Sequence, residues 1–199
     1  MNEYFLGEDA ARFSVVSFAT DATTRVPWSY NATVINAGID QMSASGKTSI
    51  SDGFEAAQQL FADDSRAGAT KIVLLLSDGE QTIDAASGKT PKQTAIDAAA
   101  LIKGQGVTVF AWGFGDKMSP ETLEKIATDP SKAILAQNLT EFTSYLNTLQ
   151  TTVCADSPDT TFSEGTATPA AEHVDSTMTL IGGAAVAVAL LALLFFTSR

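Results

Sequence analysis

Two short polar loops carry the residues best suited to chemistry in this chain of 199 residues. Ser77-Asp78-Gly79-Glu80 follows the run Lys71–Leu76, which is apolar after its first residue, and Gly46-Lys47-Thr48-Ser49 leads into a helix-like segment. Such an apolar run is typical of a central parallel strand covered on both faces. A carboxylate at its tip has no partner within the strand, and a hard cation would supply one. Mg²⁺ binds carboxylate and hydroxyl oxygens and keeps coordination positions open.

Both loops also have an ordinary structural explanation. Asp78 directly before Gly79 is a common turn former. The Thr48 hydroxyl is suited to capping the helix that follows it. The two interpretations stay open on these residues alone.

Strand-like and helix-like segments alternate over the first 153 residues. Apolar, β-branched runs predict strands, and apolar residues spaced three to four apart predict helices. The expected strands are 12–19, 24–30, 71–76, 107–114 and 133–136, and the expected helices are 32–42, 51–61, 91–103, 119–128 and 141–153. This alternation predicts an α/β fold with a doubly wound, mostly parallel sheet, whose ligands bind at the carboxyl ends of the strands.

The same segments resemble a von Willebrand factor A (vWA) domain. The resemblance lies in Phe13–Ala19, Gly46–Gly53, Lys71–Glu80, Gly106–Gly115 and Leu123–Ala127, in the family's order. It implies a metal-ion-dependent adhesion site in which Thr48 and Asp78 bind Mg²⁺ or Mn²⁺ and Ser77, Gly79 and Glu80 form the rim. A protein partner's carboxylate would then complete the coordination.

One part of the family pattern is missing. The Asp-x-Ser-x-Ser loop after the family's first strand occurs nowhere in this sequence. The resemblance places that strand before Met1, so we expect an incomplete, N-terminally truncated domain over 1–153 with a gap between strands 12–19 and 71–76. Unpaired buried backbone groups are costly, so either the fold suffers or these two strands pair directly. We expect metal binding through Thr48 and Asp78 alone to be weak or absent.

The composition changes at Cys154, the one cysteine. Residues 154–177 are rich in Ser, Thr, Pro and acidic residues, which predicts a solvated linker. Residues 178–196 carry no charge, and as a helix they would span about 28 Å, close to the thickness of a bilayer core. We expect a single-pass transmembrane helix, with 197–199 cytoplasmic and the domain extracellular or lumenal (type I), because Arg199 follows the apolar run. A lipid anchor that replaces a cleaved tail is the alternative.

Charge and residue types narrow the function. A net charge of −11 with scattered basic residues disfavours nucleic acid. The one histidine, His173, lies in the expected linker, so the domain has no histidine base and we expect no enzyme. We expect a membrane-tethered protein-binding or adhesion module, with a degenerate scaffold for metal-independent contacts as the alternative. Asn31 and Asn138 begin triplets that match the N-glycosylation acceptor.

Overall fold

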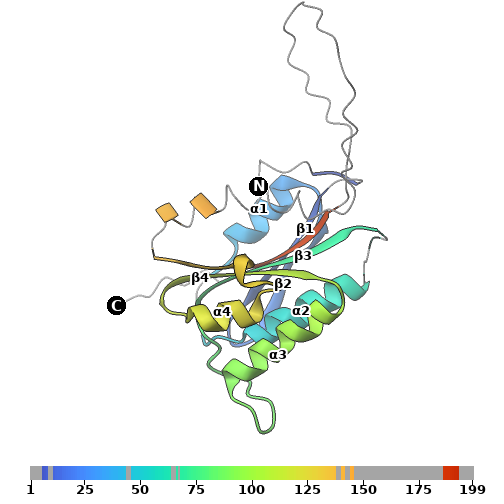
Figure 1. The fold of residues 1–199 in the computed structure, drawn as a ribbon. Coiled ribbons are helices and arrows are strands. Elements are labelled where there is room, and N and C mark those ends of the chain that lie inside the picture. The colour runs from blue at the N-terminus through green and yellow to red at the C-terminus, as the bar shows by residue number, and fades with distance from the viewer. Residues whose placement is uncertain are drawn as a thin grey trace, which may run out of the picture.

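A six-stranded sheet forms the centre of the molecule, with strand order β2-β1-β6-β3-β4-β5 (Figure 1). The computed structural model describes residues 6–8, 11–43, 46–63, 66, 68–137, 140–141, 144–145 and 186–192. The strands are β1 (Arg12–Phe18), β2 (Ala22–Ser29), β3 (Thr70–Gly79), β4 (Thr108–Lys117), β5 (Ala133–Ala136) and β6 (Val186–Ala192). The helices are α1 (Ala32–Asp40), α2 (Ile50–Asp63), α3 (Pro91–Gly104) and α4 (Pro120–Ile126), followed by a 3-10 turn at Pro130–Lys132.

The sheet is parallel except at one edge. β1 and β2 form an antiparallel pair, whereas β1–β6, β6–β3, β3–β4 and β4–β5 are all parallel. Parallel neighbours need crossover connections, which helices supply. The prediction of an α/β fold with a mostly parallel sheet is therefore confirmed, and the expected strands and helices up to residue 136 lie within a few residues of the observed ones.

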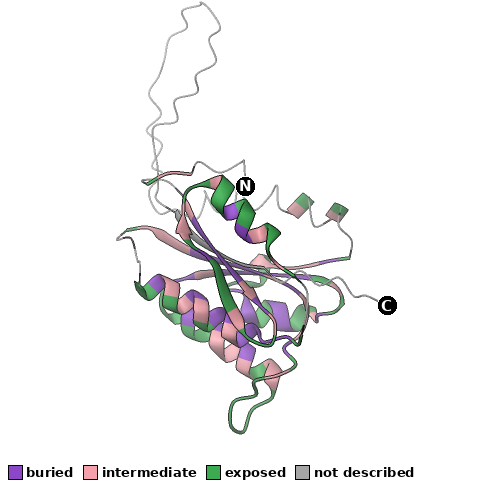
Figure 2. Cartoon of the chain, turned by 180° about the vertical axis from the view of Figure 1, so that it is seen from behind, coloured by how far each residue is buried: buried purple, intermediate pink, exposed green. Residues whose placement is uncertain are grey.

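Helices cover both faces of the sheet. α1 lies on one face, and α2, α3 and α4 lie together on the other (Figure 1). Alternate strand residues point into two apolar cores: Val16, Val73 and Leu75 belong to the core under α2–α4, and Val15 and Ile72 belong to the opposite one. Buried positions therefore concentrate in the strands and on the inner helix faces, as Figure 2 shows. Such burial on both faces explains the nearly continuous apolar run of β3.

The helix starts are fixed by side-chain caps. Asn31 accepts hydrogen bonds at the start of α1, Thr90 does so for α3, and Ser119 does so for α4. Pro91 and Pro120 follow the last two caps, where a proline loses no helical hydrogen bond. The starts predicted from Thr90-Pro91 and Ser119-Pro120 are confirmed.

The expected gap in the sheet is filled. β6 lies between β1 and β3, parallel to both, with Ala187 opposite Arg12 and Lys71, and Ala192 opposite Ser17 and Leu76. β1 and β3 do not pair with each other, so the expectation that they pair directly or leave a gap is wrong. An apolar segment from the far end of the sequence supplies the missing backbone partners.

β6 also differs from the expected transmembrane helix over 178–196. Residues 186–192 form a strand that pairs on both sides. Their composition permits this, since an uncharged run of Val, Ala and Leu suits a central strand as well as a membrane helix. None of the helices that the structure describes is long and apolar enough to cross a membrane. The other residues of 178–196, the whole expected linker and most of the expected last helix lie outside the described residues. The boundaries 1–153, 154–177 and 178–196 therefore stay predictions.

Candidate functional site

Three loops meet at the edge of the sheet where β1 and β3 have their carboxyl ends. The loop before α2 contacts the loop after β1, because Ser49 N–H donates to the Ala19 carbonyl (2.8 Å) and Lys47 N–H donates to Thr20 Oγ1 (3.3 Å). Ligands of doubly wound sheets bind at this edge. The loop of Thr48 therefore lies at the edge where the sequence placed the candidate site.

Thr48 is fastened to the segment that follows Asp78. Thr48 N–H donates to Thr82 Oγ1 (3.1 Å), and Thr82 N–H donates back to the Thr48 carbonyl (2.9 Å). The Thr48 side chain is 7% exposed, and its hydroxyl has no hydrogen-bond partner among the residues that the structure describes. A hydroxyl on a nearly buried residue, with no partner among the described residues, is suited to bind a ligand or a cation.

Asp78 lies at a bulge near the end of β3, between Ser77 and Gly79, where the pairing with β4 shifts register. Burial raises the pKa of the Asp78 carboxyl, and the Lys117 charge offsets part of that rise. Desolvation therefore disfavours the charged form of this carboxylate. A cation at this edge would stabilise it.

The predicted rim residues have structural partners. Ser77 Oγ donates to the Gly79 carbonyl (2.7 Å) and accepts from Gly79 N–H (3.3 Å), which fixes the turn around Asp78. Glu80 Oε1 accepts from Thr122 Oγ1 (2.7 Å) and forms an ion pair with Lys92 Nζ (2.9 Å). These contacts tie the end of β3 to α3 and α4.

The pKa of Glu80 reflects the same contacts. Burial alone would raise this pKa, but the hydrogen bonds from Thr122, Lys92 and Ser119 together outweigh burial and lower it. Glu80 is thus a stabilised anion with its own protein cation. It is less suited than Asp78 to bind a metal ion.

Gln81, which is 6% exposed, has a role that no sequence pattern indicated. Its Oε1 accepts from Ser51 N–H (2.7 Å), and its Nε2 donates to Ser51 Oγ (2.9 Å) and to the Ile83 carbonyl (2.9 Å). Gln81 thereby caps the start of α2 and fixes the loop that holds Thr82. A buried glutamine in a polar loop has no sequence pattern that distinguishes it from a surface one.

More carboxylates gather beside the start of α2. Burial raises the pKa of Asp52, against a hydrogen bond from Ser49, and the charges of Asp84 and Asp21 raise it further. The Ser49 and Ser51 hydroxyls lie 3.3 Å apart. The spacing Ser49-Ile50-Ser51-Asp52 was the available sequence signal. The three loops together form an acidic, hydroxyl-rich edge.

The described residues fit only part of a metal site. Thr48 and Asp78 supply one hydroxyl and one carboxylate, and no group of three or more His, Cys, Asp or Glu among the described residues could hold a metal ion. β6, at the centre of the sheet, consists of Val, Ala and Leu only and has no oxygen-bearing side chain. Mg²⁺ requires six oxygen ligands, so water or a partner would have to supply most of them.

The glycosylation candidates are placed unequally. Asn31 is exposed, and its Oδ1 accepts from Thr33 N–H (2.9 Å) and Val34 N–H (3.4 Å) as the α1 cap. Asn138 lies outside the described residues.

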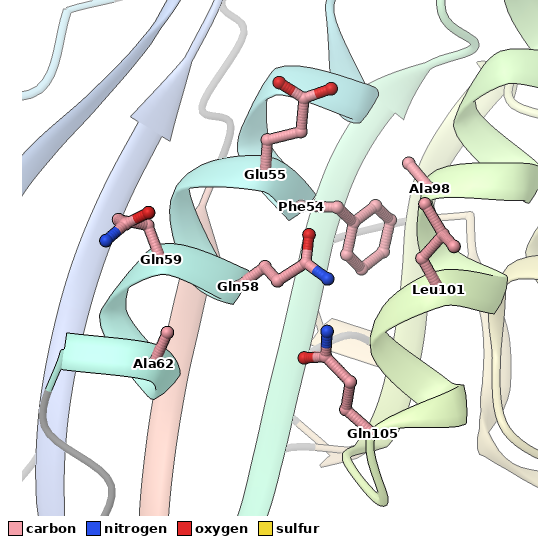
Figure 3. Close-up of a pocket in the computed structure, with 8 residues that line it drawn as sticks. All are labelled: Phe54, Glu55, Gln58, Gln59, Ala62, Ala98, Leu101 and Gln105. Atoms are coloured by element: carbon pink, nitrogen blue, oxygen red, sulfur yellow. The ribbon is translucent and has the colours of Figure 1, made fainter.

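A groove of about 520 Å³ lies between α2 and α3 (Figure 3). Phe54 and Leu101 line it together with two glutamines of α2 and Gln105, which follows the end of α3. Leu101 is 65% exposed. None of the predicted site residues lines this groove, so it is separate from the candidate site.

Solved structures with the same fold include a thread matrix protein. Proximal thread matrix protein 1 from the mussel byssus is 26% identical, with a TM-score of 0.60 over 75% of this chain and 36% of that one. A second structure of that protein, described as having zinc in its MIDAS (metal-ion-dependent adhesion site) motif, gives a TM-score of 0.61. This chain therefore spans about a third of the mussel protein.

Bacterial structures match at lower identity. The vWF domain of the type V pili tip protein Mfa5 from Porphyromonas gingivalis is 12% identical, with a TM-score of 0.65 over 77% of this chain and 83% of that one. At this identity the likeness shows the fold alone. No curated protein matches the sequence significantly. The model of the von Willebrand factor type A domain matches residues 1–152, and the chain belongs to that family.

Proposed function

We propose that this chain is a protein-binding module whose binding face consists of residues 19–21, 46–51 and 77–84. The observation that carries the proposal is the reciprocal hydrogen-bond pair between Thr48 and Thr82, which fastens the nearly buried Thr48 beside the loop of Asp78. Binding rather than catalysis is proposed because the one histidine, His173, lies outside residues 1–152, which match the family.

A divalent cation assists this binding in our proposal. Thr48 and Asp78 would bind Mg²⁺ or Mn²⁺ weakly, and a carboxylate of a protein partner would improve the coordination. Two observations support this: burial disfavours the charge of Asp78, and a protein 26% identical to this chain is described with zinc in its MIDAS motif.

The alternative is a face that binds protein without a cation. It is favoured by the absence of oxygen-bearing side chains in β6 and by the engagement of Glu80 with Lys92. The hydrogen-bonded loops would then be a rigid polar surface.

Calorimetric titration of the full chain with Mg²⁺ and with Mn²⁺ separates the two proposals. We expect weak binding that Thr48→Ala and Asp78→Asn each abolish. Glu124→Gln, which removes an exposed charge of α4, is the matched control and leaves binding unchanged. Heats that are absent in the unmodified chain, or that survive both substitutions, contradict the cation proposal and leave the metal-independent one.

We further propose that the domain is attached to a membrane in type I orientation, by residues 178–196 as a helix or, alternatively, by a lipid that replaces this tail. The uncharged length of this run supports the attachment, and a structure of similar fold is described as an aerotolerance-related membrane protein from Bacteroides fragilis. Protease treatment of sealed vesicles tests the orientation: we expect the domain to be digested and residues 197–199 to be protected. The reverse pattern contradicts it.

A further inference from the structure

The position between β1 and β3 is a site that holds a β-strand. β6 pairs there with the six residues Arg12–Ser17 on one side and the seven residues Thr70–Leu76 on the other. The segment that occupies the site, β6, has residue types that also suit a lipid bilayer.

The site cannot be left empty without cost. Val15 and Val16 of β1 and Val73 and Leu75 of β3 are fully buried. Removal of β6 would leave the facing N–H and C=O groups of both strands without partners in apolar surroundings. It would also create two apolar strand edges, which associate with other strands. The site therefore favours an apolar, extended segment that pairs on both sides.

The occupant has no strong preference for a strand. β6 contains three Ala, two Leu and two Val; Ala and Leu are strong helix formers, whereas Val favours strands. It lies within the uncharged run 178–196. A bilayer accepts such a run as a helix because a helix satisfies its own backbone hydrogen bonds. The same seven residues cannot be a sheet strand and a membrane helix at once.

We propose that the β1–β3 site and a lipid bilayer compete for Val186–Ala192. In water the segment is β6 and completes the sheet; at a bilayer it leaves, and the sheet opens between β1 and β3. This inference rests on the proposed membrane attachment. Residues 146–185 connect the segment to the domain, and a chain of that length reaches up to about 130 Å when extended.

The competition reaches the candidate binding face. Ala192, at the end of β6, is paired with Ser17 and Leu76, which lie one or two residues before the segments 19–21 and 77–84 of the binding face. Departure of β6 removes the support between these two loops. Membrane insertion and partner binding are then linked, and each alters the equilibrium of the other.

A disulfide pair in the full chain tests the competition. Leu74 and Leu190 are register partners, and adjacent strands lie about 4.8 Å apart, within the roughly 4.4–6.8 Å between Cα atoms that a disulfide bridges. We would oxidise Leu74→Cys/Leu190→Cys in a Cys154→Ser background, with and without phosphatidylcholine vesicles. Leu74→Cys/Ala184→Cys is the control outside β6. Leu74 is buried, so its replacement removes core packing. A second register pair, Leu76→Cys/Ala192→Cys, therefore distinguishes loss of strand pairing from misfolding of the first variant.

We expect intramolecular disulfides for both register pairs in water and not for the control pair. With vesicles, the chain should float with the lipid, and the crosslinked fraction should fall about tenfold. Flotation with undiminished crosslinking overturns the competition but leaves membrane attachment standing. Absence of flotation overturns the attachment and the competition together. Absence of crosslinks in water, or disulfide-linked dimers in place of intramolecular links, overturns the assignment of the site to the chain's own segment.

Discussion

Replacing Gln81 by Ala tests whether one buried amide organises the candidate site. The Gln81 side chain makes hydrogen bonds of 2.7, 2.9 and 2.9 Å with Ser51 N–H, Ser51 Oγ and the Ile83 carbonyl. Truncation removes all three hydrogen bonds and leaves Ser51 N–H, Ser51 Oγ and the Ile83 carbonyl without this partner. At about 1 kcal/mol net for each bond, the loss is about 3 kcal/mol, a large fraction of the roughly 5–15 kcal/mol that stabilises a domain.

Urea unfolding of the full chain, followed by circular dichroism, measures this loss. With a denaturant slope of about 2 kcal/mol/M, the midpoint should fall by about 1.5 M. Gln81→Glu keeps the acceptor for Ser51 N–H but lacks the amide donors, so its midpoint should lie between those of the unmodified chain and Gln81→Ala. Gln105→Ala, which truncates an exposed glutamine, should change the free energy of unfolding by less than about 0.5 kcal/mol. A Gln81→Ala midpoint equal to that of Gln105→Ala refutes the role given to Gln81.

Three further outcomes are expected. Gly38→Ala should destabilise the chain by about 1–3 kcal/mol because its Cβ would lie 2.1 Å from Val26 Cγ2. The Cβ of Gly104→Ala meets nothing within 4 Å, so this substitution should stabilise the chain by about 0.5–1 kcal/mol. Thermal unfolding compares the two variants. The pKa of Asp78 is raised in the fold, so ionisation of Asp78 destabilises the fold once the pH exceeds the ordinary pKa of an aspartate. In urea titrations, the stability of Asp78→Asn relative to the unmodified chain should therefore increase from about pH 3 to about pH 7. A constant difference contradicts this. The lowered pKa of Glu80 has the opposite sign: Glu80→Gln should cost about 1 kcal/mol at about pH 7, and the cost should vanish as the pH falls below the folded pKa; an equal cost in acid contradicts it.

Sequence patterns predicted the elements well because each pattern has a local cause. The apolar run of β3, the Ser119-Pro120 helix start and the Thr90-Pro91 start depend on a few neighbouring residues. The family resemblance placed Thr48 and Asp78 at one edge, and the Thr48–Thr82 hydrogen bonds agree with that placement.

The remaining features depend on contacts between distant residues. β6 could not be predicted, because its uncharged run suits a membrane helix as well as a buried strand, and only the vacancy between β1 and β3 decides between them. The engagement of Glu80 with Lys92 and Thr122 depends on how α3 and α4 pack against the end of β3. Likewise, no local sequence pattern distinguishes the buried Gln81 from the exposed glutamines.

Paramagnetic broadening by Mn²⁺ tests the central claim most directly, because it locates the ion as well as detecting it. In amide NMR spectra of the full chain, substoichiometric Mn²⁺ should broaden the signals of residues 46–51 and 77–84, and should spare Leu101 and Gln105 in the groove between α2 and α3. Thr48→Ala should remove the broadening. Broadening scattered over exposed acidic residues, or centred away from Thr48 and Asp78, would contradict a cation-assisted binding face at this edge of the sheet.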